Sequence, residues 1–330
     1  MKNLKLIAKK MVSEGKGILA ADESTPTCTK RFESVKVESN ASSRNRYRST
    51  LLTTKNLEQY ISGVILFDET FHQNIIGLTK TIPSYLKDKG VLTGIKVDTG
   101  AKPFAQHKNE KITEGLDDLR ERLITYKNKG ADFAKWRAVI TIDKEIPSES
   151  CIYANAHALA RYASLCQENN IVPIVEPEVL MEGEHGIEQC YKVTSQTLKI
   201  VFEQLKLLKI DLESMILKPN MILPGLHSTE NPSDKVIAEM TFTCLKDNVP
   251  EEVPGIAFLS GGQSSDLAAQ RLNTLNRLYF NKKPWQLTFS YGRALQQEAL
   301  IKWANQSDEE SQNELINRAK MNHLASIGKL

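Results

Sequence analysis

Lys218 is a lysine at a position where an uncharged side chain is expected. It directly follows the apolar run 215–217, and Pro219 and Asn220 come next. A charged ammonium at the end of a buried strand must be paired, lose its proton or take part in chemistry. A neutral lysine is a nucleophile, and full activation at pH 7 requires a pKa about 3 units below the ordinary value of about 10.4. The alternative is a lysine whose ammonium extends from the strand end into solvent.

Other strand-like runs also end in charged residues that are two positions apart. These pairs are Lys96 and Asp98, Lys135 and Arg137, and Glu176 and Glu178. Residues i and i+2 of a strand point to the same side. The sequence therefore predicts that opposite charges from several strands converge in one interior space, as in an active site built around an amine nucleophile.

Three carboxylates are candidates for acid–base chemistry. Glu176 and Glu178 lie on the same face of one strand, and two nearby carboxylates have pKa values that move apart, which gives one proton donor and one base. Asp22 ends the run GKGILAAD. The alternatives are a solvated loop for the glutamate pair and, for Asp22, a helix N-cap formed by Asp22 or Ser24.

Anion binding is predicted at two places. Ser260, Gly261 and Gly262 in SGGQS offer backbone amides that an anion can approach closely, and Arg293 in SYGRAL can add a bidentate contact. The loops after strands seven and eight of a barrel commonly bind phosphate. Lys30 and Arg31 are candidates for a second anion site. A plain turn and surface cations are the alternatives.

The histidines and glycines argue against two common cofactors. Histidines 72, 107, 157, 185, 227 and 323 show no HxH, HExxH or HxxxH spacing, so no catalytic metal is predicted. No GxGxxG follows a strand, so a nicotinamide cofactor is not predicted either.

Eight apolar, β-branched runs alternate with longer segments of helical periodicity. The runs are 17–22, 61–69, 93–98, 132–137, 171–178, 214–220, 255–262 and 285–292. Their spacing of about 30 to 45 residues suits βα units, and eight units predict one parallel α/β barrel over residues 1–330. A doubly wound open sheet is the alternative. Residues 1–12 predict an added N-terminal amphipathic helix, and residues 308–325 predict an extra C-terminal helix.

Composition is that of a soluble globular protein, with 41% hydrophobic and 25% charged residues. The net charge of +3 favours neither nucleic acid nor an anionic membrane as a partner. No run is long enough to cross a bilayer. Five scattered cysteines without CxxC spacing suit a reducing cytoplasm.

Eight motifs in order resemble those of class I fructose-1,6-bisphosphate aldolases. They are GKGILAADES, GVILFDET, GIKVD, DFAKWR, VPIVEPE, MILKPNMILPG, FLSGGQS and PWQLTFSYGRALQ, and they span essentially the whole chain. The resemblance implies a TIM barrel, a homotetramer and metal-free cleavage of fructose 1,6-bisphosphate to dihydroxyacetone phosphate and glyceraldehyde 3-phosphate in glycolysis and gluconeogenesis. Cleavage of the carbon–carbon bond leaves a carbanion beside a carbonyl. A protonated imine at that carbonyl is a better electron sink than the ketone itself.

The resemblance also implies roles for individual residues. Lys218 matches the Schiff-base nucleophile, Glu176 the main acid–base group, Glu178 its assistant, and Asp22 the base for the C4 hydroxyl. Lys135 and Arg137 match contacts to substrate hydroxyls and the second phosphate, and Lys96 lines the pocket. The first phosphate site matches Ser260, Gly261, Gly262 and Arg293, and the clamp on the second phosphate matches Thr27, Lys30 and Arg31. Ser290 and Gly292 match further substrate- or phosphate-binding positions.

Two departures from the family pattern affect these expectations. Animal members end in a tail with a C-terminal tyrosine that is proposed to move the enamine proton, whereas this sequence ends in ASIGKL. Another group or water is then expected to move that proton. STPTCTKR replaces the more usual opening of the clamp, and Pro26 stiffens it. The alternative functions are an imine aldolase preferring fructose 1-phosphate or another phosphosugar, and a non-catalytic binding scaffold.

Overall fold

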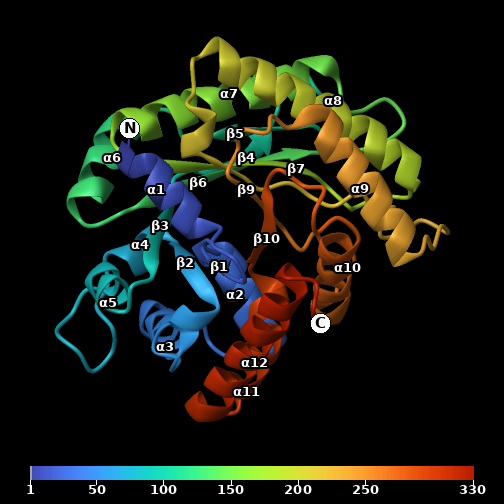
Figure 1. The fold of residues 1–330 in the computed structure, drawn as a ribbon. Coiled ribbons are helices and arrows are strands. Elements are labelled where there is room, and N and C mark those ends of the chain that lie inside the picture. The colour runs from blue at the N-terminus through green and yellow to red at the C-terminus, as the bar shows by residue number, and fades with distance from the viewer. Residues whose placement is uncertain (1) are drawn as a thin grey trace.

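Eight parallel strands close into a barrel in the computed structural model, which describes residues 2–330 (Figure 1). Met1, the first residue of the predicted N-terminal helix, lies outside the described residues. Around the barrel the strand order is β1-β2-β3-β6-β7-β8-β9-β10, and β10 pairs again with β1. The strands are β1 (Gly17–Ala21), β2 (Ile61–Leu66), β3 (Leu92–Lys96), β6 (Phe133–Ile140), β7 (Val172–Val179), β8 (Ile216–Leu217), β9 (Gly255–Phe258) and β10 (Gln286–Tyr291). The predicted closed barrel is confirmed, and the open sheet is wrong.

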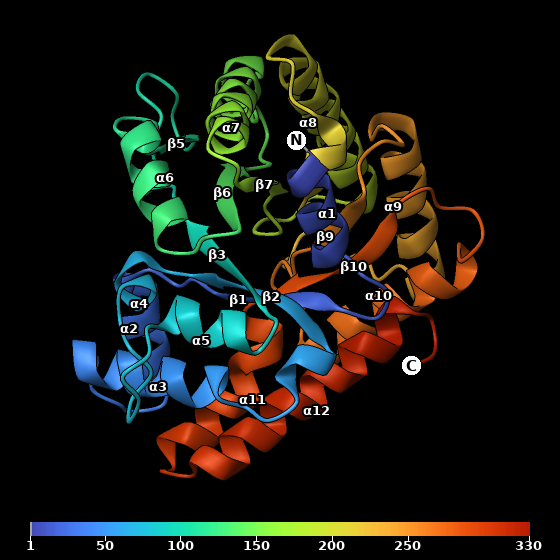
Figure 2. The ribbon, with the colours of Figure 1, turned by 60° about the vertical axis from the view of Figure 1, so that its left-hand side comes forward.

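Helices surround the barrel and return the chain between strands (Figures 1 and 2). They are α1 (Lys2–Met11), α2 (Thr25–Ser34), α3 (Ala41–Leu52), α4 (Asp68–Phe71), α5 (Ile82–Asp88), α6 (Leu119–Asn128), α7 (Glu149–Glu168), α8 (Ile187–Leu207), α9 (Asp234–Asn248), α10 (Ser265–Leu278), α11 (Arg293–Ala304) and α12 (Asp308–Ser326), with 3-10 turns η1 (Leu57–Gln59) and η2 (Leu212–Ser214). The predicted extra C-terminal helix is α12, which packs along α11 (Figure 2).

Helix α1 packs against the amino-terminal end of the barrel interior. Its apolar face, formed by Leu4, Ala8 and Met11, belongs to the same buried cluster as Phe133 of β6 and Ile216 of β8. These apolar residues recur at helical spacing, so one face of a basic helix is buried while Lys9 and Lys10 are exposed. The charged residues of the barrel therefore gather at the opposite end.

Alternation along β6 shows how one strand serves both the core and the site. Phe133 contributes to the cluster inside the barrel, and Lys135 and Arg137 point to the same side further along. Trp136 points outward and packs against Tyr162 of α7, with ring centroids 5.6 Å apart. Because successive side chains alternate, anchoring Trp136 under α7 fixes the two cations on the interior side.

Three predicted strands are too long. The run 255–262 has only Gly255–Phe258 as β9, and Gly261 and Gly262 adopt positive φ values in the loop that follows. The run 61–69 ends as a strand at Leu66, because the acidic residues Asp68 and Glu69 occupy the first turn of α4, where the helix dipole favours them. The run 214–220 has only Ile216–Leu217 as β8, because Ser214 belongs to η2 and Pro219 has no amide hydrogen to extend the pairing.

A short antiparallel hairpin after β3 has no counterpart in the predicted elements. It consists of β4 (Gly100–Pro103) and β5 (Lys111–Glu114). Both strands are four residues long and lack an apolar run, so their sequences carry little strand signal. The hairpin stands at the carboxyl end of the barrel, beside β6.

The cysteines and the helices relate to the predicted reducing compartment and to the predicted lack of a bilayer-spanning run. All five cysteines are free and buried. Among the helices described over residues 2–330, none combines the length and apolarity needed to span a bilayer.

Candidate active site

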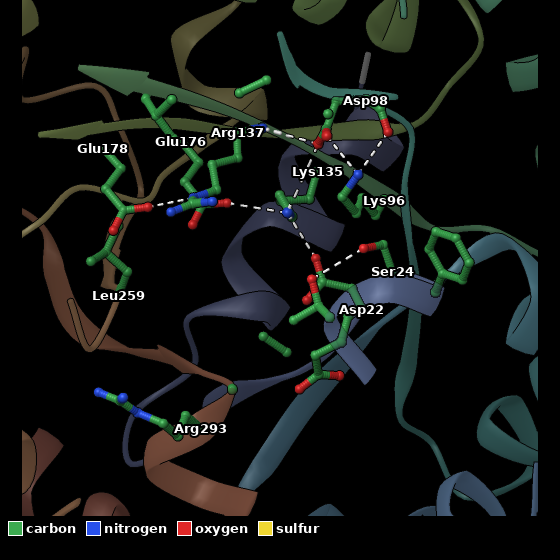
Figure 3. Close-up of a pocket in the computed structure, with 18 of the residues that line it drawn as sticks. Asp22, Ser24, Lys96, Asp98, Lys135, Arg137, Glu176, Glu178, Leu259 and Arg293 are labelled. Carbon is green, nitrogen blue, oxygen red and sulfur yellow. Dashed lines mark hydrogen bonds and ion pairs between the residues drawn. The ribbon is translucent and has the colours of Figure 1, made fainter. Parts of the chain in front are cut away.

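Lys135 lies at the centre of a buried cluster of charges at the carboxyl end of the barrel (Figure 3). Its ammonium is 2.7 Å from a carboxylate oxygen of Asp22, 3.5 Å from Glu176 and 3.9 Å from Asp98. Burial by itself lowers the pKa of Lys135, but these carboxylates outweigh burial and raise it. Lys135 therefore stays protonated and works as a fixed positive charge.

Asp22 follows β1 and faces this positive charge. Burial by itself raises the pKa of Asp22, but the ammonium groups of Lys135 and Lys218 outweigh burial and hold the pKa well below its usual range. Asp22 is therefore ionised and able to accept a proton from a bound hydroxyl. The N-cap of α2 is Ser24, so the interpretation of Asp22 as a cap is wrong.

Lys218 and Glu176 come from adjacent strands and form a direct pair. Lys218 is 4% exposed, and its Nζ lies 3.1 Å from Oε1 of Glu176. The other oxygen of Glu176, Oε2, is buried and makes no hydrogen bond in the structure. One carboxylate oxygen thus meets the Lys218 amine, while the second lies 3.5 Å from the Lys135 ammonium. The interpretation of Lys218 as a solvent-directed lysine is wrong.

The remaining strand-end charges are also paired. Arg137 donates from Nε to Glu178, its neighbour across β6 and β7, and Lys96 at the end of β3 pairs with Asp98. Parallel register brings these residues level, since Lys96 lies opposite Lys135 and Arg137 opposite Glu176. The predicted convergence of opposite charges is confirmed.

A second group of predicted residues forms a polar edge where β9 and β10 end. Gly261 and Gly262 have φ values of 52° and 81°, which favour glycine. A Cβ on Gly261 would lie 3.0 Å from Sδ of Met181, so a side chain there would also be crowded. Ser290 of β10 is 1% exposed, and its hydroxyl has no hydrogen-bond partner. Arg293 begins α11, is exposed and faces this edge without an ion pair among the described residues (Figure 3).

Helix α2 brings the predicted clamp residues to the same opening. Thr27 lies in its first turn, where its hydroxyl is 3.1 Å from that of Ser24. Lys30 is exposed, whereas Arg31 donates to the carboxylate of Glu23. Nη2 of Arg31 is 3.8 Å from where a Cβ would lie on Gly292. Arg31 therefore reaches the side of the site formed by β10, and it is already neutralised.

One cavity of about 1350 Å³ joins all of these groups. Every residue that the sequence assigned to the site lines it: Asp22, Thr27, Lys30, Arg31, Lys96, Lys135, Arg137, Glu176, Glu178, Lys218, Ser260, Gly261, Gly262, Ser290, Gly292 and Arg293. Residues separated by more than two hundred positions thus meet in one space. Within residues 2–330 no group of three or more His, Cys, Asp or Glu is arranged to hold a metal ion.

Comparison with known proteins identifies the family. The family model described as glycolytic fructose-bisphosphate aldolase class I matches residues 3–330. The chain belongs to the class I fructose-bisphosphate aldolase family. This family consists of carbon–carbon lyases that need no metal and act through a lysine Schiff base.

Similar aldolases come from distant organisms. A probable class 1 fructose-bisphosphate aldolase of Xanthomonas campestris pv. campestris is 50% identical over 328 residues, which cover 98% of this chain and 96% of the relative. Fructose-bisphosphate aldolase 2 of Caenorhabditis elegans is 48% identical and covers 98% and 88%. A Plasmodium falciparum aldolase, solved in complex with TRAP and a small-molecule inhibitor, superposes with a TM-score of 0.97 at 44% identity, over 99% of this chain and 95% of that one.

A buried network behind the aldolase site was not predicted. Glu23, next to Asp22, accepts from Arg31 of α2, from Arg48 of α3 at 2.5 Å and from Gln296 of α11 at 3.1 Å. Arg48 is only 2% exposed. Arg48 lies inside the weakly amphipathic α3, so no periodic pattern in the sequence predicted that it would be buried. The adjacent acidic pair at the end of β1 was the only available indication that two carboxylates needed partners.

Glu23 predicts how the stability of this aldolase depends on pH. Burial raises the pKa of Glu23, but Arg48 and Arg31 outweigh burial and lower it. A carboxyl whose pKa is lowered on folding stabilises the protein above its unfolded pKa of about 4.3, and that contribution is lost as pH falls below this value. Urea unfolding of the wild-type protein should show this loss.

The variant Glu23→Gln isolates the contribution of Glu23. It is expected to be less stable at neutral pH, because Arg48 loses its counterion, and to lose less stability on acidification than the wild-type protein. Asp117→Asn, on the exposed surface, is the control and should keep the wild-type slope. An unchanged slope in Glu23→Gln would show that this carboxyl has the same pKa in both states.

Proposed function

We propose that Lys218 forms the Schiff base through which this aldolase cleaves fructose 1,6-bisphosphate to dihydroxyacetone phosphate and glyceraldehyde 3-phosphate. The observation that carries the proposal is the buried contact of 3.1 Å between Lys218 Nζ and Glu176 Oε1. A proton passed across this contact leaves a neutral amine beside its acid. The amine then attacks the C2 ketone of the open-chain sugar.

Glu176 supplies the proton transfers that turn the first adduct into an imine. The carbinolamine must lose its hydroxyl as water, which requires a proton donor at that oxygen. Oε2 of Glu176 makes no hydrogen bond and lies 3.5 Å from the Lys135 ammonium, so it can serve this step while Oε1 stays beside the nitrogen. Glu178, which is paired with Arg137, assists from the next inward position of β7.

Asp22 then removes the proton of the C4 hydroxyl. As that oxygen becomes the aldehyde, the C3–C4 bond breaks and its electrons move into the protonated imine. Lys135 lies 2.7 Å from Asp22 and keeps it ionised in the resting site. The same ammonium can donate to substrate hydroxyls, so it orients the sugar at the bond that breaks.

The two phosphates are proposed to occupy opposite ends of the cavity. The first lies near Ser260, Gly261, Gly262, Ser290, Gly292 and Arg293, where backbone amides, open hydroxyls and an exposed guanidinium are available. The second lies toward Lys96, Arg137, Thr27 and Lys30, and Arg31 of α2 adjoins both sites, since its Nη2 lies 3.8 Å from where a Cβ would lie on Gly292.

A preference for fructose 1-phosphate is the second candidate function. Arg137 and Arg31 are each ion-paired with a carboxylate of the protein, so a second phosphate must compete with those partners. Arg293 has no such partner among the described residues. This contrast favours stronger binding of the first phosphate than of the second.

Comparing the two sugars tests the proposed function. We expect kcat/KM to be at least about tenfold higher for fructose 1,6-bisphosphate than for fructose 1-phosphate, because each added charge-assisted contact contributes about that factor. Equal values would assign the enzyme to monophosphates. No turnover of either sugar, with intact folding, would favour the binding scaffold.

We further propose that residues 1–330 act as one domain in a cytoplasmic homotetramer. The free, buried cysteines suit a reducing compartment. A similar aldolase of Arabidopsis thaliana, 48% identical over 316 residues, is named cytosolic. Fructose bisphosphate cleavage places the enzyme in glycolysis and, in reverse, gluconeogenesis.

A further inference from the structure

Asp98 is a buried carboxylate that the proposed reaction leaves without a chemical step. It lies two residues beyond Lys96, after the end of β3, and its side chain is 3% exposed. It also lines the active-site cavity. Carboxylates are rarely buried unless their oxygens have partners, so the partners of Asp98 indicate what it does.

Each oxygen of the Asp98 carboxylate has a different donor. Oδ1 lies 2.5 Å from Nζ of Lys96, which also donates to the backbone oxygen of Asp98 at 2.7 Å. Oδ2 accepts from the backbone N–H of Arg137 at 3.2 Å and lies 3.9 Å from Nζ of Lys135. Figure 3 shows this carboxylate between the two lysines. One side chain therefore joins β3 to the strand that carries both other cations.

Two features make the contact to Lys96 more than a surface ion pair. The ammonium is held by both the side chain and the backbone of the same residue, which fixes its position at two points. The side chain of Lys96 is 14% exposed, so the pair is largely shielded from water and salt. A flexible lysine is thus ordered before any ligand arrives, which reduces the entropy lost on binding.

We propose that Asp98 is a positioning residue that sets the preference for bisphosphorylated sugars by fixing the Lys96 ammonium at the outer end of the cavity. The inference rests on the proposed function, in which Lys96 lies beside the second phosphate. Asp98 acts through Lys96 and does not touch the reacting carbons.

An amide cannot replace this carboxylate. The donors Lys96 Nζ and Arg137 N–H meet different oxygens, and asparagine has only one oxygen. Asp98→Asn must therefore lose the side-chain contact to Lys96, which leaves only the backbone oxygen of residue 98, or leave the Arg137 amide facing another donor. The strand ends stay joined without Asp98, because the N–H of Val97 donates to the Lys135 carbonyl at 3.1 Å.

The test measures kcat/KM of Asp98→Asn for fructose 1,6-bisphosphate and for fructose 1-phosphate. We expect the ratio of the two values to fall about tenfold, the effect of one hydrogen bond to a charged group. A loss carried equally by both sugars, or an unchanged ratio, would overturn the role of Asp98. Asp117→Asn, an exposed aspartate, should keep the wild-type ratio.

A double-mutant cycle with Lys96→Met separates positioning from a general structural effect. If Asp98 acts through Lys96, adding Asp98→Asn to Lys96→Met should lower the bisphosphate preference no further. Additive losses would overturn the proposal. Should Asp98→Asn fail to fold, Asp98→Glu keeps the charge but displaces the carboxylate, and it must also lower the ratio.

The same measurements keep the two proposals distinct. Failure of the unaltered enzyme to cleave fructose 1,6-bisphosphate would overturn the proposed function and the role of Asp98 together. Normal wild-type cleavage with an unaltered ratio in Asp98→Asn and Asp98→Glu would overturn only the role of Asp98.

Discussion

Replacing Lys218 by methionine is expected to lower aldolase turnover by at least about 10⁴-fold while the protein stays folded. Methionine fills a similar space but has no nitrogen to form the imine. Glu176 keeps Lys135 at 3.5 Å, so the buried carboxylate is not left without a cation. Steady-state cleavage of fructose 1,6-bisphosphate and circular dichroism measure the two parts of this prediction.

Chemical trapping connects the lost activity to the amine itself. Borohydride reduction with dihydroxyacetone phosphate should label Lys218 in the unaltered enzyme and leave no label in Lys218→Met. Lys199→Met, an exposed lysine of α8, is the matched control and should keep both activity and label. Label on another lysine, or a near-normal rate in Lys218→Met, would contradict an imine at this position.

Glu176→Gln is expected to lower kcat by about 10² to 10⁴-fold, the range typical for loss of a general acid–base group. Glutamine preserves the shape and can accept one hydrogen bond from Lys218, but it can neither take the amine proton nor return it to the leaving hydroxyl. Borohydride trapping of Lys218 should slow in parallel, because formation of the imine is itself the impaired step.

The control for Glu176→Gln is the same substitution at the cavity mouth. Glu182 follows the end of β7 and lines the cavity, but it is exposed and has no ion pair among the described residues, so Glu182→Gln should keep kcat near the unaltered value. A kcat reduced equally in both variants would show that net charge, and not proton transfer by Glu176, controls the rate. Trapping at the normal rate in Glu176→Gln would place the acid–base role elsewhere.

The barrel and its charged centre could be predicted because strand periodicity carries the information. Lys135 and Arg137 stand two apart after an apolar run, so their shared direction follows from the geometry of any strand. Lys218 and Glu176 needed only the closed order of the strands to become neighbours. The same local rules predicted the position of Gly261 and Gly262, since loops after β9 and β10 open on the same end.

Other parts of the site depended on pairing that no local pattern encodes. Arg31 was predicted as a candidate anion ligand, yet Glu23 neutralises it, and Arg48 reaches the same carboxylate from a different helix. The polar hairpin β4–β5 is held by long-range contacts such as Thr113 Oγ1 to the Arg137 carbonyl at 2.8 Å. Such contacts are selected by tertiary packing, so short polar segments show no periodic signal beforehand.

The packing of α1 against the amino-terminal end of the barrel interior affects the order in which the products leave. Leu4, Ala8 and Met11 fill that end, so substrate and products are expected to enter and leave through the cavity at the carboxyl end of the barrel. In the proposed mechanism, the three-carbon ketone fragment is still covalently attached to Lys218 when the C3–C4 bond breaks, whereas the aldehyde fragment is already free. The aldehyde must therefore leave first, and excess aldehyde should compete for the vacated space before hydrolysis releases its partner.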